Sequence, residues 1–172
     1  MKFMPSLGNR KTAADWPDLA EIDHATKRLR GRIVHTPIMD LTQAALIPLL
    51  PDGARVSLKL ELFQQAGSFK ARGALLSIDA LNDAQRAAGV TAASGGNHAL
   101  AVSWAAATAG VQAHVHMPQA TDPARLEGCR ALGATITLHA DIAAAFAASE
   151  NGLWAAGATA HGVLTVAEIL KD

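Results

Sequence analysis

Cysteine is nearly absent from this sequence: among its 172 residues, Cys129 is the single cysteine. A lone cysteine excludes a disulfide within the chain, which favours a reducing compartment such as the cytoplasm. Net charge is absent as well, because fifteen basic residues balance fifteen acidic ones. That balance gives no electrostatic reason to expect nucleic acid or a membrane as a partner. Cys129 itself is expected to be a small packed residue on a helix.

Long apolar runs are missing too. The N-terminus has no continuous apolar segment of the kind that a secretion signal requires. The most apolar stretch, residues 99–115, is interrupted by polar residues and glycine, so it indicates a buried helix and strand and not a membrane span. No P-loop or G-x-G-x-x-G motif is present. With 50% hydrophobic residues, the chain has enough apolar surface for a folded core, which argues against disorder.

Cap and turn residues divide the chain into alternating helices and strands. The expected elements are a helix over 19–30 capped by Asp18, a short helix over 41–50, strands over 90–93, 113–117 and 135–139, a helix over 99–109, and a helix from Asp122 to Gly133. Strands separated by helices of this length form right-handed βαβ units. The sequence therefore predicts an α/β fold with a parallel sheet, and a ligand at the carboxyl ends of its strands.

Lys70 lies between a strand-like run over 56–60 and a helix-like run over 72–76. Backbone on both sides holds a lysine placed in this way, and apolar neighbours press against it. Loss of water favours the neutral amine of a lysine, and a neutral amine can attack a carbonyl to form a Schiff base. A lone lysine of this kind is most often a surface residue at the start of a helix, and only its combination with a second motif favours the Schiff base.

A glycine-containing turn over residues 94–98 follows the predicted strand over 90–93 and leads into a helix. Free backbone N–H groups and the positive end of the helix dipole favour an anion at such a turn. Gly95 and Gly96 let a ligand approach the backbone, while Ser94 and Asn97 offer side-chain hydrogen bonds. The alternative is a turn that only caps the helix.

Histidines suggest no metal site. His114 and His116 are two residues apart on a predicted strand, so they face the same side. No cluster of cysteines or carboxylates near them would complete a tetrahedral site, so no metal is expected. His139 is interpreted as an isolated residue.

Together, the lysine segment and the glycine turn resemble one family. Residues 59–74 resemble the cofactor-lysine motif of the serine/threonine dehydratases, and residues 91–99 resemble that family's asparagine loop. Further similarity lies in residues 28–38, 117–120 and 130–134. These dehydratases are pyridoxal-phosphate enzymes of fold type II, the tryptophan synthase β group, which also holds serine racemase. The chain resembles roughly the first half of a family member and ends before the glycine-rich loop that cups the cofactor phosphate.

The resemblance implies a three-layer αβα architecture with a parallel sheet, as an incomplete fold type II enzyme. It implies an N-terminal arm over 1–17, the first part of a large cofactor-binding domain over 18–74, a small α/β domain over 75–158, and the start of a return to the large domain over 159–172. A complete member would be expected to form a homo-oligomer that acts on a small amino acid.

The resemblance also implies roles for the candidate residues. Lys70 would hold pyridoxal 5'-phosphate as a Schiff base and later take the proton from the substrate Cα. Phe69 would pack beside the cofactor ring, and Asn97 would donate a hydrogen bond to its 3′-oxygen. The substrate carboxylate would be held by Ser94, Gly95, Gly96 and His98. The implied reaction converts L-threonine or L-serine to a 2-oxo acid and ammonia.

Two departures from the family pattern bear on the reaction. Gly95 stands where the racemase branch has a serine that acts as an acid and base, so elimination is favoured over racemisation. Ala66 stands where the family usually has threonine. Serine racemase and hydroxyaspartate dehydratase remain alternative enzymatic activities. The non-enzymatic alternative is a catalytically inactive remnant or a partner-binding domain.

Overall fold

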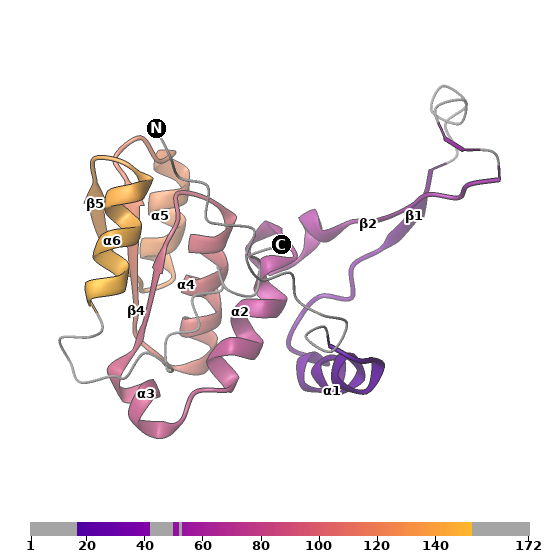
Figure 1. Ribbon diagram of the computed structural model, residues 1–172, viewed down its shortest axis with the longest axis horizontal. Helices are drawn as coiled ribbons and strands as arrows, with labels where there is room; N and C mark the ends of the chain where they lie inside the picture. The colour runs from indigo at the N-terminus through magenta and orange to yellow at the C-terminus, as the bar shows by residue number, and fades with distance from the viewer. Residues whose placement is uncertain (1–16, 42–49, 52, 153–172) are drawn as a thin grey trace, which may run out of the picture.

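The structure is a computed structural model that describes residues 17–41, 50, 51 and 53–152. Figure 1 shows an α/β part and, beside it, a helix and a β-hairpin, and the hairpin projects away from the α/β part. The predicted arm over 1–17 and the predicted helix over 41–50 fall almost wholly outside the described residues. The predicted return segment over 159–172 lies outside them entirely.

A three-stranded parallel sheet forms the centre of the α/β part. Its strands are β3 (Val90–Ala93), β4 (Ala113–Pro118) and β5 (Thr135–His139), in the order β3-β4-β5. The register places Val115 opposite both Ala92 and Ile136. Each strand begins where the sequence predicts it, and the parallel pairing confirms the predicted fold class.

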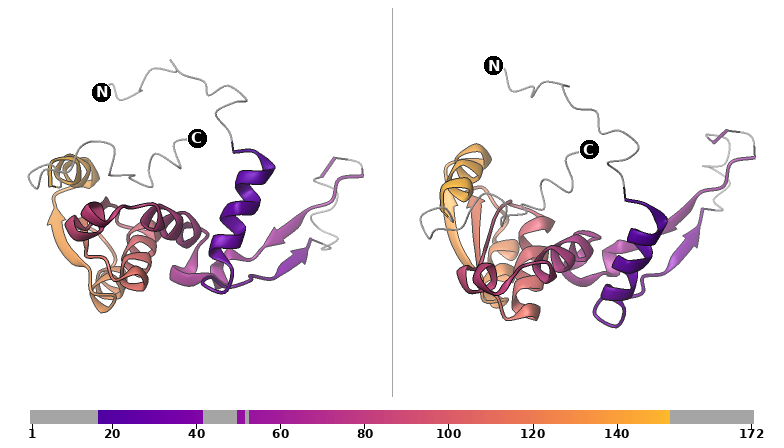
Figure 2. Two further views of the ribbon diagram at one scale, coloured as in Figure 1. Left: turned by 90° about the horizontal axis from the view of Figure 1, so that it is seen from below. Right: turned by 60° about the horizontal axis from the view of Figure 1, so that its bottom comes forward.

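Helices cover both faces of this sheet (Figure 2). One face carries α4 (Asn97–Ala109) and α5 (Pro123–Ala131), and the other carries α6 (Ile142–Gly152). Gly110 ends α4 in the left-handed region at φ 66°, a conformation that glycine adopts without a Cβ clash. The predicted three-layer αβα arrangement is therefore confirmed.

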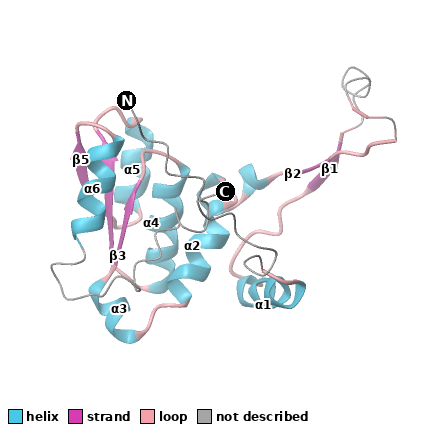
Figure 3. Ribbon diagram, in the orientation of Figure 1, coloured by secondary structure: helices cyan, strands magenta, loops and turns pink. Residues whose placement is uncertain are grey.

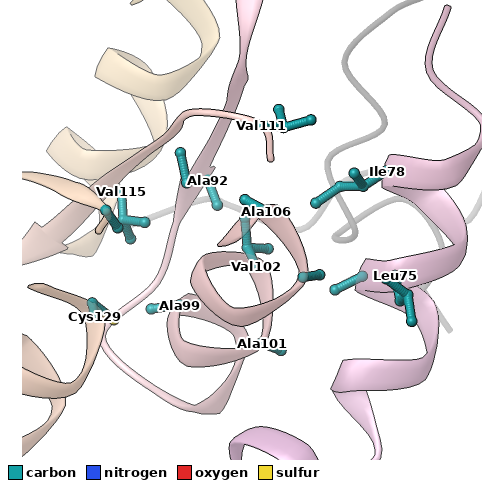
Figure 4. Close-up of a cluster of buried hydrophobic side chains, with 14 of the residues drawn as sticks. Leu75, Ile78, Ala92, Ala99, Ala101, Val102, Ala106, Val111, Val115 and Cys129 are labelled. Atoms are coloured by element: carbon teal, nitrogen blue, oxygen red, sulfur yellow. The ribbon is translucent and has the colours of Figure 1, made fainter. Parts of the chain in front are cut away.

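Helix α2 (Lys70–Asp79) packs against α4 and leads into the short helix α3 (Asp83–Ala88). Figure 4 shows that Leu75 and Ile78 of α2 lie against α4, whose other side meets the sheet. Three alanines of α4 are fully buried in this position, namely Ala99, Ala101 and Ala105. Their small side chains let α4 lie close to its neighbours on both sides.

The remaining part consists of α1 (Leu19–Leu29) and an antiparallel hairpin of β1 (Ile38–Asp40) and β2 (Ser57–Lys59). Asp18 caps α1 as predicted, through a capping box with Glu21. Arg32 donates two hydrogen bonds, of 2.5 and 3.0 Å, to Asp79, so the end of α1 is tied to α2.

The predicted boundary between residues 74 and 75 falls inside α2, and the division into domains stays a prediction. In the part of the chain that the structure describes, no helix is both long and apolar enough to cross a bilayer.

Candidate functional site

Lys70 is the first residue of α2 and is half-buried. The connection from β2 is longer than the sequence suggested, because two short 3₁₀ turns, Glu61–Phe63 and Gln65–Gly67, lie between the strand and the helix (Figure 3). Ala66 in the second turn has φ 57°, a left-handed conformation that costs a non-glycine residue about 1–2 kcal/mol. The contacts around the turn must therefore hold it in place.

Two polar side chains supply such contacts. Gln64 is buried, and its amide pairs with the backbone of Val34: the oxygen accepts from N–H at 2.9 Å and the nitrogen donates to C=O at 2.8 Å. Glu61 accepts hydrogen bonds from Arg72 at 2.9 and 2.7 Å and from Thr36 at 2.5 Å. The hydrogen bond from Arg72 lowers the pKa of Glu61 to about 2, so the carboxylate stays charged. The first turn of α2, which begins with Lys70, is thus anchored from outside the helix.

The glycine turn lies at the carboxyl end of β3, as predicted. Its Ser94 N–H donates to the carbonyl of His116 on β4 at 3.0 Å, and the Ser94 hydroxyl accepts from Gly96 N–H at 3.1 Å. Gly96 occupies the N-cap of α4, and no side chain of the described residues caps that helix end. First-turn N–H groups of a helix have no partner within the helix, so the start of α4 can bind an anion.

Gly95 and Gly96 have different surroundings. A Cβ atom on Gly95 would lie 2.7 Å from the Thr121 hydroxyl oxygen and 3.3 Å from Pro118 Cδ. A Cβ atom on Gly96 would meet nothing closer than the Ser94 hydroxyl oxygen at 3.9 Å. The absent side chain of Gly95 makes room for Pro118, the last residue of β4, and for Thr121, in the turn between β4 and α5. That both glycines let a ligand approach the backbone stays a prediction.

His98 connects the turn with Lys70. The side chain is 9% exposed, and its Nδ1 atom has no hydrogen-bond partner among the described residues. Burial, and then the positive charge of Lys70, lower the pKa of His98 to about 4, so the ring is neutral at pH 7. Helix α2 and the 3₁₀ turn before it both pack against α4, so the lysine segment and the helix that follows the glycine turn are neighbours.

Other candidate residues differ in how they are placed. Phe69, which precedes Lys70, is 51% exposed, and the neighbouring Ser68 is buried with no partner for its hydroxyl in the described part of the chain. Asn97 begins α4, and its side-chain oxygen accepts a hydrogen bond from Arg125 of α5 at 2.5 Å.

Arg125 and Thr121 lie outside the residues that the sequence motifs predict for the site. A signal was present, because the Asp122–Pro123 cap sets the start of α5 at the carboxyl end of β4, beside the glycine turn.

The histidines on the other face of the sheet correct one prediction. His114 and His116 do share a side, with ring centroids 4.4 Å apart. His139 is not isolated, because its Nε2 atom lies 2.9 Å from Nδ1 of His116. Burial, then the neighbouring histidines, lower the pKa of His116 to about 4. Within the described ranges, no group of three or more histidine, cysteine or acidic residues could hold a metal ion.

The chain is similar to a family of known enzymes over most of its length. The family described as "Pyridoxal-phosphate dependent enzyme" matches residues 30–168. Phenylserine dehydratase of Ralstonia pickettii is 45% identical over 122 residues, which are 71% of this chain and 36% of that protein. L-threonine ammonia-lyase of Thermotoga maritima is 41% identical over 126 residues, or 72% of this chain and 30% of that protein. The structure of maize serine racemase matches with a TM-score of 0.71 at 34% identity and covers 83% of this chain and 42% of that one.

The chain thus spans about a third of the length of the curated relatives it matches. The resemblance to the serine/threonine dehydratases and serine racemase is confirmed, and so is the match to the fold type II enzymes. This chain belongs to the family of pyridoxal-phosphate dependent enzymes, and its relatives there include dehydratases, ammonia-lyases and serine racemases.

Proposed function

We propose that this chain supplies the cofactor lysine and the substrate-carboxylate turn of an ammonia-lyase that acts on β-hydroxy amino acids. One observation carries the proposal: α2, which begins with Lys70, packs against α4, which begins at the glycine turn. Two segments that are separate in the sequence would therefore form a single site. The dehydratases and ammonia-lyases among the relatives support this type of reaction.

The residues present fit pyridoxal 5'-phosphate. Three groups near the proposed site lack partners among the described residues: the Ser68 hydroxyl, the His98 Nδ1 atom and the uncapped start of α4. Buried polar groups of this kind are normally hydrogen-bonded, and the oxygens of a phosphorylated cofactor or of a carboxylate would pair with the donors among them. When bound, the cofactor supplies an electron sink for the negative charge that develops at the substrate Cα.

The chain's own residues would divide the remaining work. The Lys70 amine would hold the cofactor and, once released from it, take the proton from the substrate Cα. The N–H groups at the start of α4 would bind the substrate carboxylate with the help of the helix dipole. Because His98 is neutral, its ring would not compete with these N–H groups for the carboxylate. The Asn97 amide would donate a hydrogen bond to the cofactor 3′-oxygen.

Elimination is the favoured reaction, because Gly95 has no side chain that could return a proton to the substrate. L-threonine and L-serine are the first substrates to test, and phenylserine and hydroxyaspartate follow. Racemisation of serine stays the second candidate, since the Thr121 hydroxyl, a group that could exchange a proton, lies over Gly95. Measuring 2-oxo acid and D-serine in the same reaction separates the two activities.

Lys70→Ala provides the direct test. Wild-type protein mixed with pyridoxal phosphate should develop a visible absorbance band that the variant lacks. Reduction with borohydride should then fix the cofactor to the peptide that carries Lys70, as detected by mass spectrometry. Lys27→Ala is the matched control, since Lys27 is an exposed lysine on α1. A band that persists in Lys70→Ala, or a label on another lysine, would contradict the proposal.

A non-catalytic, partner-binding domain is the competing function, and one feature favours it. Leu62, Phe63 and Phe69 are large apolar side chains close to Lys70 in the sequence, and they are 63%, 57% and 51% exposed. Exposed apolar groups that cluster often mark surfaces that other protein covers. A folded wild-type chain that forms no Lys70-dependent absorbance band with pyridoxal phosphate would favour the partner-binding function.

A further inference from the structure

Arg125 contacts the side chain of Asn97 at the entrance to α4. Its Nη1 atom lies 2.5 Å from the Asn97 side-chain oxygen, and both residues are partly buried. A guanidinium group carries only donors, whereas an amide has one donor end and one acceptor end. The amide oxygen must therefore face Arg125, because the reversed amide would set two donors against each other. The NH₂ group of Asn97 is consequently turned away from Arg125.

We propose that Arg125 is a positioning residue of the site, which fixes the Asn97 amide with its NH₂ group directed at the ligand. This inference rests on the proposed function, because the ligand is taken to be the 3′-oxygen of pyridoxal phosphate. A hydrogen bond from a charged donor is stronger than a neutral one and polarises the group that accepts it. Arg125 therefore both orients Asn97 and makes its NH₂ group a better donor to an anionic oxygen.

The position of Arg125 is itself fixed by the fold. Asp122 caps α5 by accepting a hydrogen bond from Ala124 N–H at 2.8 Å. Gly128 lets α5 lie close to α4, since a Cβ atom there would be 2.8 Å from Leu100 Cδ2. Within the described part of the chain, no carboxylate forms an ion pair with Arg125. Asn97 is thus the acceptor that the structure provides for this guanidinium group.

A purely structural link between α4 and α5 is the competing explanation, and ligand binding separates the two. Arg125→Met removes the donor while keeping most of the side chain's length. It should weaken binding of pyridoxal phosphate about tenfold, the loss of one hydrogen bond, measured by titrating the Lys70-dependent band. Arg125→Lys should recover part of the affinity. Arg130→Met, an exposed arginine on the same helix, should bind as wild type does.

A double-mutant cycle tests whether Arg125 acts through Asn97. Asn97→Ala should weaken binding at least as much as Arg125→Met, and the double variant should bind no more weakly than Asn97→Ala alone. A purely structural link predicts a lower melting temperature with unchanged affinity. Affinity in Arg125→Met equal to wild type, or additive losses in the double variant, would overturn the proposal.

A measurement without cofactor keeps this inference separate from the proposed function. Nitrogen-15 NMR relaxation of the Asn97 side-chain NH₂ group should show a rigid amide in wild type and a mobile one in Arg125→Met. If the wild type forms no Lys70-dependent band, the proposed function fails while this result still tests the orientation of Asn97. Unchanged Asn97 signals in Arg125→Met would overturn the positioning role whatever the cofactor does.

Discussion

Adding a methyl group at Gly95 should destabilise the protein through Thr121. The new Cβ atom would lie 2.7 Å from the Thr121 hydroxyl oxygen, closer than ordinary van der Waals contact, and 3.3 Å from Pro118 Cδ. Thr121 is β-branched and 8% exposed, so it cannot easily move aside. Overpacking of this kind typically costs about 1–3 kcal/mol. The φ of Gly95 lies outside the left-handed region, so the cost should come from the contact alone.

Three further variants isolate that contact. Thr121→Ala should have little effect by itself, because the buried hydroxyl that it removes has no hydrogen-bond partner among the residues that the structure describes. Combined with Gly95→Ala, it should recover most of the lost stability, a coupling of at least about 1 kcal/mol. Gly96→Ala is the matched control. Its Cβ atom would meet nothing closer than the Ser94 hydroxyl oxygen at 3.9 Å, so alanine there should cost only about 0.5 kcal/mol, for a less favourable N-cap residue.

Urea unfolding followed by circular dichroism gives the free energy of unfolding for all four variants and the wild type. A Gly95→Ala variant as stable as wild type would refute a steric role of Thr121. The same conclusion would follow if Gly96→Ala lost as much stability as Gly95→Ala, or if Thr121→Ala restored none in the double variant.

Two predictions concern pH. Glu61→Gln should lower the free energy of unfolding at pH 7 by about 1–3 kcal/mol. Because the pKa of Glu61 is lowered to about 2, its contribution should be complete above the unfolded value of about 4.3 and disappear as pH falls through about 2. Urea unfolding at several pH values checks this, and a gap between the two proteins that stays constant down to pH 2 would refute it. His98 and His116 have pKa values lowered to about 4, so stability should decline as pH falls from about 6.5 towards 4, where the unfolded chain binds more protons. NMR titration of the histidine rings should show both midpoints near 4, and midpoints near 6.5 would contradict the buried, neutral state.

Local signals in the sequence predicted much of the fold. The strands β3 and β5 have the predicted bounds, and Gly110 and the Asp122 cap set helix ends where the structure has them. Caps, glycines and apolar periodicity act over a few residues, so they can be interpreted without knowing the tertiary structure. The resemblance then related Lys70 to the glycine turn, and the packing of α2 on α4 supplies the physical reason for their proximity.

Contacts between distant residues could not be predicted in the same way. Arg125 meets Asn97, and Thr121 meets Gly95, only because α5 packs beside α4 at one edge of the sheet. His116 and His139 meet because of the register between β4 and β5. The left-handed Ala66 had no signal at all, since alanine rarely adopts that conformation.

The alanines of α4 have a consequence for the chemistry as well as for packing. Lys70 begins the helix on one side of α4, and the glycine turn begins α4 itself, so the width of α4 sets the distance between the amine and the turn. Alanine is therefore a spacer in this site. A larger residue at Ala101 or Ala105 would shift α2 outward and carry Lys70 away from the turn, although neither alanine has a reactive group. Under the proposed function, the distance between Lys70 and the turn would therefore limit side-chain volume in the hydrophobic core.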